Sequence, residues 1–228
     1  MSSRAGDAMG LIDRWAALAG PDTRRLGSEL IARYAEPHRR YHTGDHLVAV
    51  LDLVDELTEP PGPGGVAAEA DLDADADAIR LAAWFHDAVY DPARADNEER
   101  SARLAERMLA DTDLAAPTVR EVARLVRLTE THDPAAGDRA GEVLCDADLA
   151  VLAGEPAAYA AYAAAVREEY GFVPDDAFAR GRAQVLRGLL ARPAIFRTAR
   201  AHERFEAAAR HNIATELTLL STGPSALE

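Results

Sequence analysis

Helix-forming residues dominate this chain and runs of alternating β-branched residues are nearly absent, which limits its fold more than any other feature. Alanine, leucine, arginine and glutamate have high helix propensity. Of the 228 residues, 48% are hydrophobic, which is enough to bury one sizeable core without disulfides. We therefore predict an all-α, single-domain bundle (residues 1–228) of roughly eight to ten helices. The apolar spacing places them near residues 8–19, 23–36, 43–58, 75–90, 96–111, 117–131, 145–153, 156–170, 175–191 and 200–220.

One segment lacks the residues that a packed core needs. Residues 59–78, EPPGPGGVAAEADLDADADA, combine prolines, glycines and acids. About 60 residues precede this segment, too few for an independent core. We expect a mobile surface loop here rather than a domain boundary.

Charge and composition exclude several classes of partner and chemistry. The formal net charge of -14 argues against a long nucleic acid, which binds mainly through basic side chains. All 25 basic residues are arginine, so P-loop and Schiff-base lysines are excluded. Cys145 is the only cysteine, which rules out an internal disulfide and a thiolate zinc cluster.

The N-terminal residues MSSRAGDAMG lack the apolar stretch of a signal peptide, and no run approaches the roughly 18 apolar residues of a membrane span. We therefore expect a cytoplasmic protein without a membrane partner. The sequence leaves the oligomeric state open.

Three clusters contain side chains that bind divalent metals: YHTGDH at 41–46, WFHDAVYD at 84–91 and CDAD at 145–148. His42 and His46 stand four residues apart, so they share one face if the helix begins by His42. His86 is in register with the buried side of its predicted helix. Burying charged groups without partners costs several kcal/mol, so a shared cation is the simplest explanation for the clusters.

The ordered pattern His46, then His86-Asp87, then Asp148 resembles the H…HD…D signature of the HD superfamily of metal-dependent phosphohydrolases. The resemblance extends through DNEERSARLAE, CDADLAVLAG, YAAYAAAVREEYG and GRAQVLRGLLARPAIFRT, and is to a bacterial branch of predicted HD phosphohydrolases. It implies that these four residues hold one divalent metal ion. Imidazole and carboxylate ligands suit manganese, iron, cobalt, nickel or zinc, with magnesium less natural.

The resemblance selects Asp148 over Asp146 as the ligand, because the closing aspartate of such families lies in an Ala-Asp-hydrophobic segment. Asp146 is then expected to orient a ligand or a water. A second metal ion would require further ligands, and His132 and Asp91 are the candidates.

The stretch YHTGDH is also similar to the YHN…H segment of cyclic-nucleotide phosphodiesterases, with Thr43 replacing the asparagine. That similarity implies that His42 protonates the leaving oxygen while His46 binds metal, and that Asp87 both holds the ion and orients a water. The alternative for His42 is a structural role, capping a helix or packing under Tyr41.

Four further residues are weaker candidates for the site. Arg40, Arg182 and Arg187 could bind a substrate phosphate or be surface arginines paired with acids. His132 could reach the mouth of the pocket.

The resemblance implies hydrolysis of a phosphate ester or anhydride of a small metabolite or nucleotide, by attack of a water bound to the metal. It leaves open phosphomonoesterase, phosphodiesterase and pyrophosphohydrolase activity. Two alternatives remain: a di-iron oxygenase of the HD type, and a non-catalytic nucleotide-binding sensor.

Overall fold

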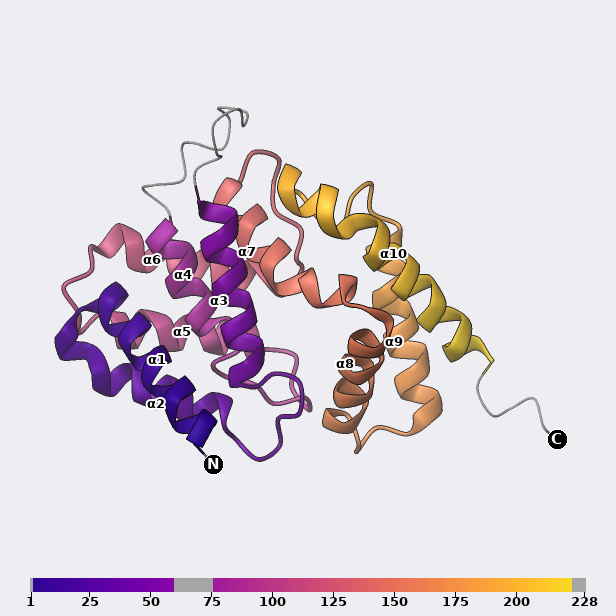
Figure 1. Cartoon of the computed structure of the whole chain (residues 1–228), viewed down its shortest axis with the longest axis horizontal. Helices are drawn as coiled ribbons and strands as arrows, with labels where there is room; N and C mark the ends of the chain where they lie inside the picture. The colour runs from indigo at the N-terminus through magenta and orange to yellow at the C-terminus, as the bar shows by residue number, and fades with distance from the viewer. Residues whose placement is uncertain (1, 60–75, 223–228) are drawn as a thin grey trace. The chain divides into compact units, whose positions relative to one another are not determined.

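The structure is a computed structural model that describes residues 2–59 and 76–222, with side chains from residue 9 onward. These residues form ten α-helices with short 3-10 helices between some of them, and they contain no strand, so the all-α prediction is confirmed (Figure 1). The helices are α1 (Ser2–Ala19), α2 (Arg24–Tyr34), α3 (Gly44–Thr58), α4 (Ala76–Phe85), α5 (Asn97–Leu109), α6 (Ala116–Leu128), α7 (Arg139–Leu149), α8 (Pro156–Glu169), α9 (Asp175–Leu190) and α10 (Ala199–Ser221).

The chain divides into two compact units, residues 1–147 and 148–228. The first contains α1 to α6 and all but the last turn of α7, and α8 to α10 belong to the second. The single-domain organisation stays a prediction. Within the predicted loop at 59–78, residues 60–75 lie outside the described residues, and α4 already begins at Ala76.

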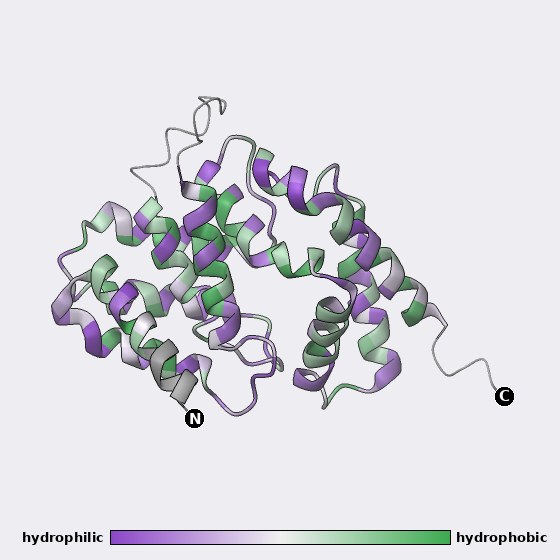
Figure 2. Cartoon of the chain, viewed as in Figure 1, coloured by the Kyte–Doolittle hydropathy of each residue, from purple (hydrophilic) through white to green (hydrophobic). Residues whose placement is uncertain are grey.

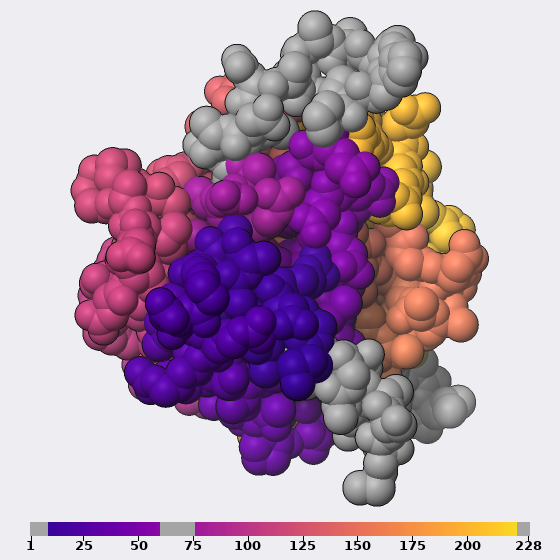
Figure 3. Space-filling model, turned by 60° about the vertical axis from the view of Figure 1, so that its left-hand side comes forward, coloured from indigo at the N-terminus to yellow at the C-terminus, as the bar shows by residue number. Residues whose placement is uncertain are grey.

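An aromatic cluster forms the centre of the first unit. Trp15 of α1 packs edge-on against Trp84 and Phe85 of α4, with ring centroids 5.3 and 5.9 Å apart. Gly27 permits α2 to approach, because a Cβ atom there would lie 2.6 Å from the Trp15 ring. In the space-filling view, the indigo residues of α1 and α2 form a continuous surface of this unit (Figure 3). The cluster fixes the end of α4, directly before His86.

Helix α3 packs on α4 through apolar residues at helical spacing. Leu47, Val50, Leu51 and Val54 are buried, and hydrophobic and hydrophilic residues alternate around α3 (Figure 2). Burying a side chain of this size stabilises the fold by about 1.5–3 kcal/mol. The same packing fixes His46, which precedes Leu47 in the first turn of α3.

Beside the metal-binding clusters, the predicted helix start at 43 is confirmed to within one residue, but the condition that this helix begin by His42 is not met, and the predicted helix end at residue 90 is wrong. Helix α3 begins at Gly44, so His42 lies in the preceding loop. Helix α4 ends at Phe85 instead of continuing to residue 90. Helix α4 ends there because side chains outside it bind the backbone groups that would extend it: Arg39 donates to the carbonyls of Asp87 and Ala88, and the N–H of Asp91 donates to Asn97.

Two other predicted boundaries concern α7 and α5. Helix α7 begins at Arg139, earlier than the predicted residue 145, so the whole CDAD segment is helical. Asp96 occupies the N-cap position of α5, so this helix begins one residue after the predicted 96, and the Asp96 carboxylate accepts from the Arg94 guanidinium instead of from the helix N–H groups.

Buried polar anchors hold the second unit together. Glu206 accepts hydrogen bonds from the N–H groups of Ile195 and Phe196, and Asn212 donates to the carbonyls of Leu152 and Gly154. Helices α8, α9 and α10 line a groove of about 730 Å³ whose walls include Arg187 but none of the predicted metal ligands.

None of the described helices is both long and apolar enough to cross a bilayer by itself. One bent pair, Arg139–Ala153 with Pro156–Glu169, has the length and composition of a span only when the two helices are taken together.

Candidate metal centre

His46 lies in the first turn of α3 with a side chain that is almost completely buried. Its Nδ1 atom is 2.9 Å from the hydroxyl oxygen of Tyr41. A tyrosine hydroxyl can accept a hydrogen bond from a protonated Nδ1, which leaves the lone pair of the neutral imidazole on Nε2. That Nε2 atom points at the second histidine of the site.

His86 directly follows α4 and is 2% exposed. Its Nδ1 atom is 2.8 Å from the carbonyl oxygen of Ala83. Because a carbonyl only accepts hydrogen bonds, Nδ1 of His86 carries a proton. In the neutral ring the lone pair therefore lies on Nε2, as a metal ligand requires.

The two Nε2 atoms lie 3.1 Å apart. Asp87 places its Oδ2 atom 3.1 Å from Nε2 of His86 and 3.5 Å from Nε2 of His46. Electron-rich atoms this close require a proton or a cation between them, and the carboxylate favours positive charge at that point. The donor set of two imidazole nitrogens and a carboxylate fits a divalent transition-metal ion.

Asp87 stays ionised in this setting. Burial by itself raises the pKa of its carboxyl group, but electrostatic interactions with His86 and His42 and side-chain hydrogen bonding with His46 and His86 outweigh burial. The result is a pKa well below the ordinary value. An ionised carboxylate is the form that binds a metal ion.

Asp148 lies on the last turn of α7, a helix whose first nine residues, 139–147, belong to the first unit. His46, His86 and Asp148 each offer one ligand atom, and these atoms all lie within 4.8 Å of one another. Asp146 is fully buried on the same helix, whereas Asp148 is half-buried. The assignment of Asp148 as ligand and Asp146 as its support stays a prediction.

His42 lies beside His46 although it is outside the helix. The two ring centroids are 6.0 Å apart, and the His42 ring stacks on Tyr90 at 4.2 Å with an interplanar angle of 29°. Tyr41 contacts the same ring edge-on at 4.9 Å. The predicted closeness of His42 and His46 is therefore present, but the loop produces it instead of one turn of helix.

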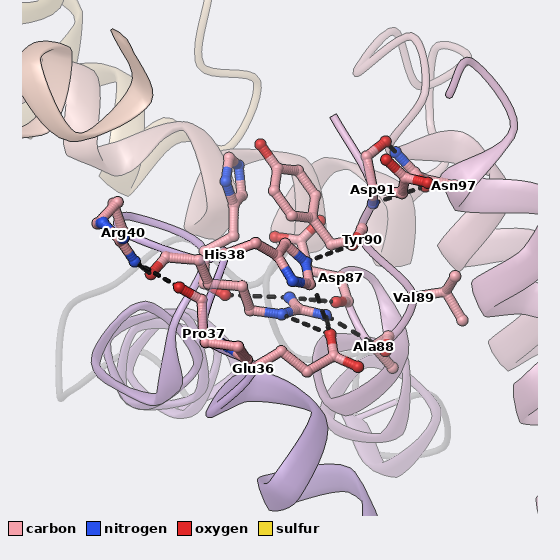
Figure 4. Close-up of polar contacts among 12 residues, drawn as sticks. Glu36, Pro37, His38, Arg40, Asp87, Ala88, Val89, Tyr90, Asp91 and Asn97 are labelled. Atoms are coloured by element: carbon pink, nitrogen blue, oxygen red, sulfur yellow. Dashed lines mark hydrogen bonds and ion pairs between the residues drawn. The ribbon is translucent and has the colours of Figure 1, made fainter. Parts of the chain in front are cut away.

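The two arginines Arg40 and Arg182, predicted as weaker candidates, bond to groups other than the metal-binding residues. Arg40 folds back to donate to the carbonyls of Pro37 and Arg39 (Figure 4). Arg182 belongs to the second unit, where it donates to Glu216 at 2.8 and 3.1 Å and to the Tyr162 hydroxyl at 3.1 Å. Its pKa is raised above the ordinary value: burial opposes the charge, but Tyr162 and Glu216 outweigh it.

His132 follows α6 in the left-handed region, with a φ of 48°. It is half-buried and interacts electrostatically with Glu98 in the first turn of α5. Burial, and then the negative charges of Asp87 and Glu130, raise the pKa of Glu98, and His132 partly opposes this rise. His132 therefore belongs to an acidic neighbourhood that includes Asp87.

Sequence reasoning missed three residues that support the site: Tyr41, Tyr90 and Arg39. Tyr41 bonds to His46 and Tyr90 stacks on His42. Arg39 donates to the backbone of both histidine-containing segments. Tyr41 and Tyr90 lie within the motifs at 41–46 and 84–91, and the sequence had offered Tyr41 only as a packing partner of His42. Nothing in the sequence separates Arg39 from Arg40.

The chain was compared with protein-family models, curated proteins and solved structures, and none of them matches it.

Proposed function

We propose that this protein is a metal-dependent phosphohydrolase in which His46, His86, Asp87 and Asp148 hold one divalent ion. The observation that carries the proposal is the 3.1 Å approach of the two histidine Nε2 atoms beside the Asp87 carboxylate. The Nδ1 atoms of both rings are engaged with Tyr41 and Ala83, which favours ligation through Nε2. A bound divalent ion supplies Lewis acidity: it acidifies water and offsets the charge of phosphate oxygens.

His42 is the proposed proton donor to the leaving oxygen. Its ring is held by Tyr90 and Tyr41 close to His46. General-acid catalysis of this kind contributes about 10²–10⁴ in rate. Asp87 has a second role, because its carboxylate can accept a hydrogen bond from the attacking water and orient it.

The proposed substrate is a small phosphorylated metabolite or nucleotide, and the proposed place of action is the cytoplasm. The formal net charge of -14 argues against a polyanion as substrate.

A screen tests this function directly. The purified protein is loaded in turn with Mn²⁺, Fe²⁺, Co²⁺, Ni²⁺, Zn²⁺ and Mg²⁺ and assayed for phosphate release from a panel of phosphorylated metabolites. We expect about one ion per chain and turnover that chelation abolishes. Two irons per chain with consumption of oxygen would instead favour the oxygenase, and nucleotide binding without turnover by the metal-loaded protein would favour the sensor.

A further inference from the structure

Arg39 is a buried cation in the loop between α2 and α3. Its side chain has no exposed surface. Burying a guanidinium is costly unless every donor is bonded, so a position of this kind requires a compensating network. The surroundings of Arg39 supply one.

All five N–H donors of the guanidinium have acceptors. Nε and Nη2 both donate to Oε2 of Glu36 at 3.1 Å. Nη1 donates to the carbonyls of His42 at 3.0 Å and Asp87 at 2.8 Å. Nη2 also donates to the carbonyl of Ala88 at 3.4 Å, and Glu36, Asp87 and Ala88 can be followed in Figure 4. Arginine has five such donors in a fixed plane, so none is left over.

Two tyrosine rings fix the guanidinium in place. The Cζ atom of Arg39 lies 5.2 Å from the ring centre of Tyr34 and 5.4 Å from that of Tyr90. Tyr34 is itself anchored, because its hydroxyl donates to the carbonyl of Trp84 at the end of α4. Tyr90 also stacks on His42. Arg39 therefore contacts Tyr90, which stacks on His42, and Tyr34, which is bonded to the end of α4 just before His86.

The single nitrogen Nη1 joins the two segments that carry the site. His42 stands just before α3, whose first turn holds His46, and Asp87 stands just after α4, next to His86. Arg39 takes up the Asp87 and Ala88 carbonyls where α4 stops. On the basis of the proposed function, we infer that Arg39 is a positioning residue that sets the separation of the His42-His46 and His86-Asp87 segments for metal binding.

Lysine does not fulfil this role. Its ammonium group has three donors and no planar fork, so it cannot serve His42, Asp87, Ala88 and Glu36 together. A positive charge at position 39 is therefore not sufficient to join the two segments, because the planar set of five donors is also required. The effect of Arg39→Lys on metal affinity can therefore be measured separately from its effect on stability.

The test measures Mn²⁺ and Co²⁺ affinity by calorimetry for the wild type, Arg39→Lys and Arg39→Ala, alongside thermal unfolding. We expect binding to weaken by about 10–100-fold in both variants, the range for losing a residue that orients ligands. Low concentrations of guanidinium ion should partly restore affinity in Arg39→Ala, whereas methylammonium at the same concentration should not. Arg39→Lys provides the result if Arg39→Ala does not fold.

Arg210→Lys is the matched control, because Arg210 likewise donates to Glu206 and to the carbonyls of Leu190 and Arg192, in the second unit. It should lose thermal stability and keep its metal affinity. Wild-type affinity in Arg39→Lys, or an equal loss of affinity in Arg210→Lys, overturns the positioning role and leaves the metal centre standing. A wild-type protein that binds neither ion overturns the proposed function as well, so the two failures are distinguishable.

Discussion

The Nε2 atoms of His46 and His86 face each other at 3.1 Å, and each ring is oriented by a different partner at Nδ1. Helix α3 supplies one ring and the end of α4 supplies the other, so packing of these two helices creates the pair. The proposed metal ion accounts for the gathering of two imidazoles and a carboxylate in a nearly dry place.

Loss of a metal ligand should abolish binding and hydrolysis together. His46→Ala, His86→Ala, Asp87→Ala and Asp148→Ala are each expected to lower metal affinity by more than about 100-fold, because direct ligands exceed the effect of residues that only orient them. Asp146→Ala should lower metal affinity by a smaller factor. Mass spectrometry of bound metal measures this. Full occupancy in Asp148→Ala with loss in Asp146→Ala would exchange the roles of the two aspartates.

Tyr41→Phe removes the hydroxyl that orients His46 and keeps the ring. We expect metal affinity to fall by about 10–100-fold with little change in the unfolding temperature. Calorimetric titration measures the affinity. Tyr159→Phe, which removes a hydroxyl that donates to Glu216 in the second unit, is the control and should bind metal normally. Equal affinity in Tyr41→Phe and wild type would remove Tyr41 from the site.

His42→Ala should retain its metal and lose turnover in a way that depends on the leaving group. An alkyl phosphate ester needs a proton at the departing oxygen, so its hydrolysis should fall by about 10²–10⁴. A nitrophenyl ester departs without that proton and should be affected only slightly. Steady-state rates on both esters decide the matter. An equal loss for both esters, or loss of the metal, contradicts the role of His42 as an acid.

Glu206 should make stability depend on pH. Burial raises the pKa of its carboxyl group, but hydrogen bonds from Phe196, Ile195 and Arg210 outweigh burial and lower it. The folded-state pKa is thus below the unfolded one. The contribution of the carboxylate is therefore present above the unfolded pKa of about 4.3 and is lost as pH falls through the folded value.

Glu206→Gln tests this dependence. At neutral pH it should lower the free energy of unfolding by about 1–3 kcal/mol, since the N–H donors of Ile195 and Phe196 lose a charged acceptor. Denaturant melts at several pH values measure the difference between variant and wild type, which should shrink under acid conditions. A difference that is constant with pH would show that the charge of Glu206 does not matter.

The sequence by itself determined the helical class and most of the helix positions, because apolar spacing along one helix is a local property. Leu47, Val50 and Val54 mark the buried face of α3 without knowledge of any partner. The sequence also identified His46, His86 and Asp148 as candidate metal ligands, and in the structure their ligand atoms lie within 4.8 Å of one another. Their role as metal ligands is still a prediction.

Only the tertiary structure decided how the helices end and which side chains support the site. Helical spacing continues past Phe85, yet α4 stops there because Arg39, 48 residues before Asp87, and Asn97, six residues after Asp91, bind backbone groups that would extend the helix. Tertiary contacts also distinguish Arg39 from its neighbour Arg40. The Arg39 guanidinium is fully enclosed between Tyr34 and Tyr90, whereas Arg40 folds onto the backbone of its own loop. Such choices depend on contacts between residues distant in sequence, and local spacing contains no information about them.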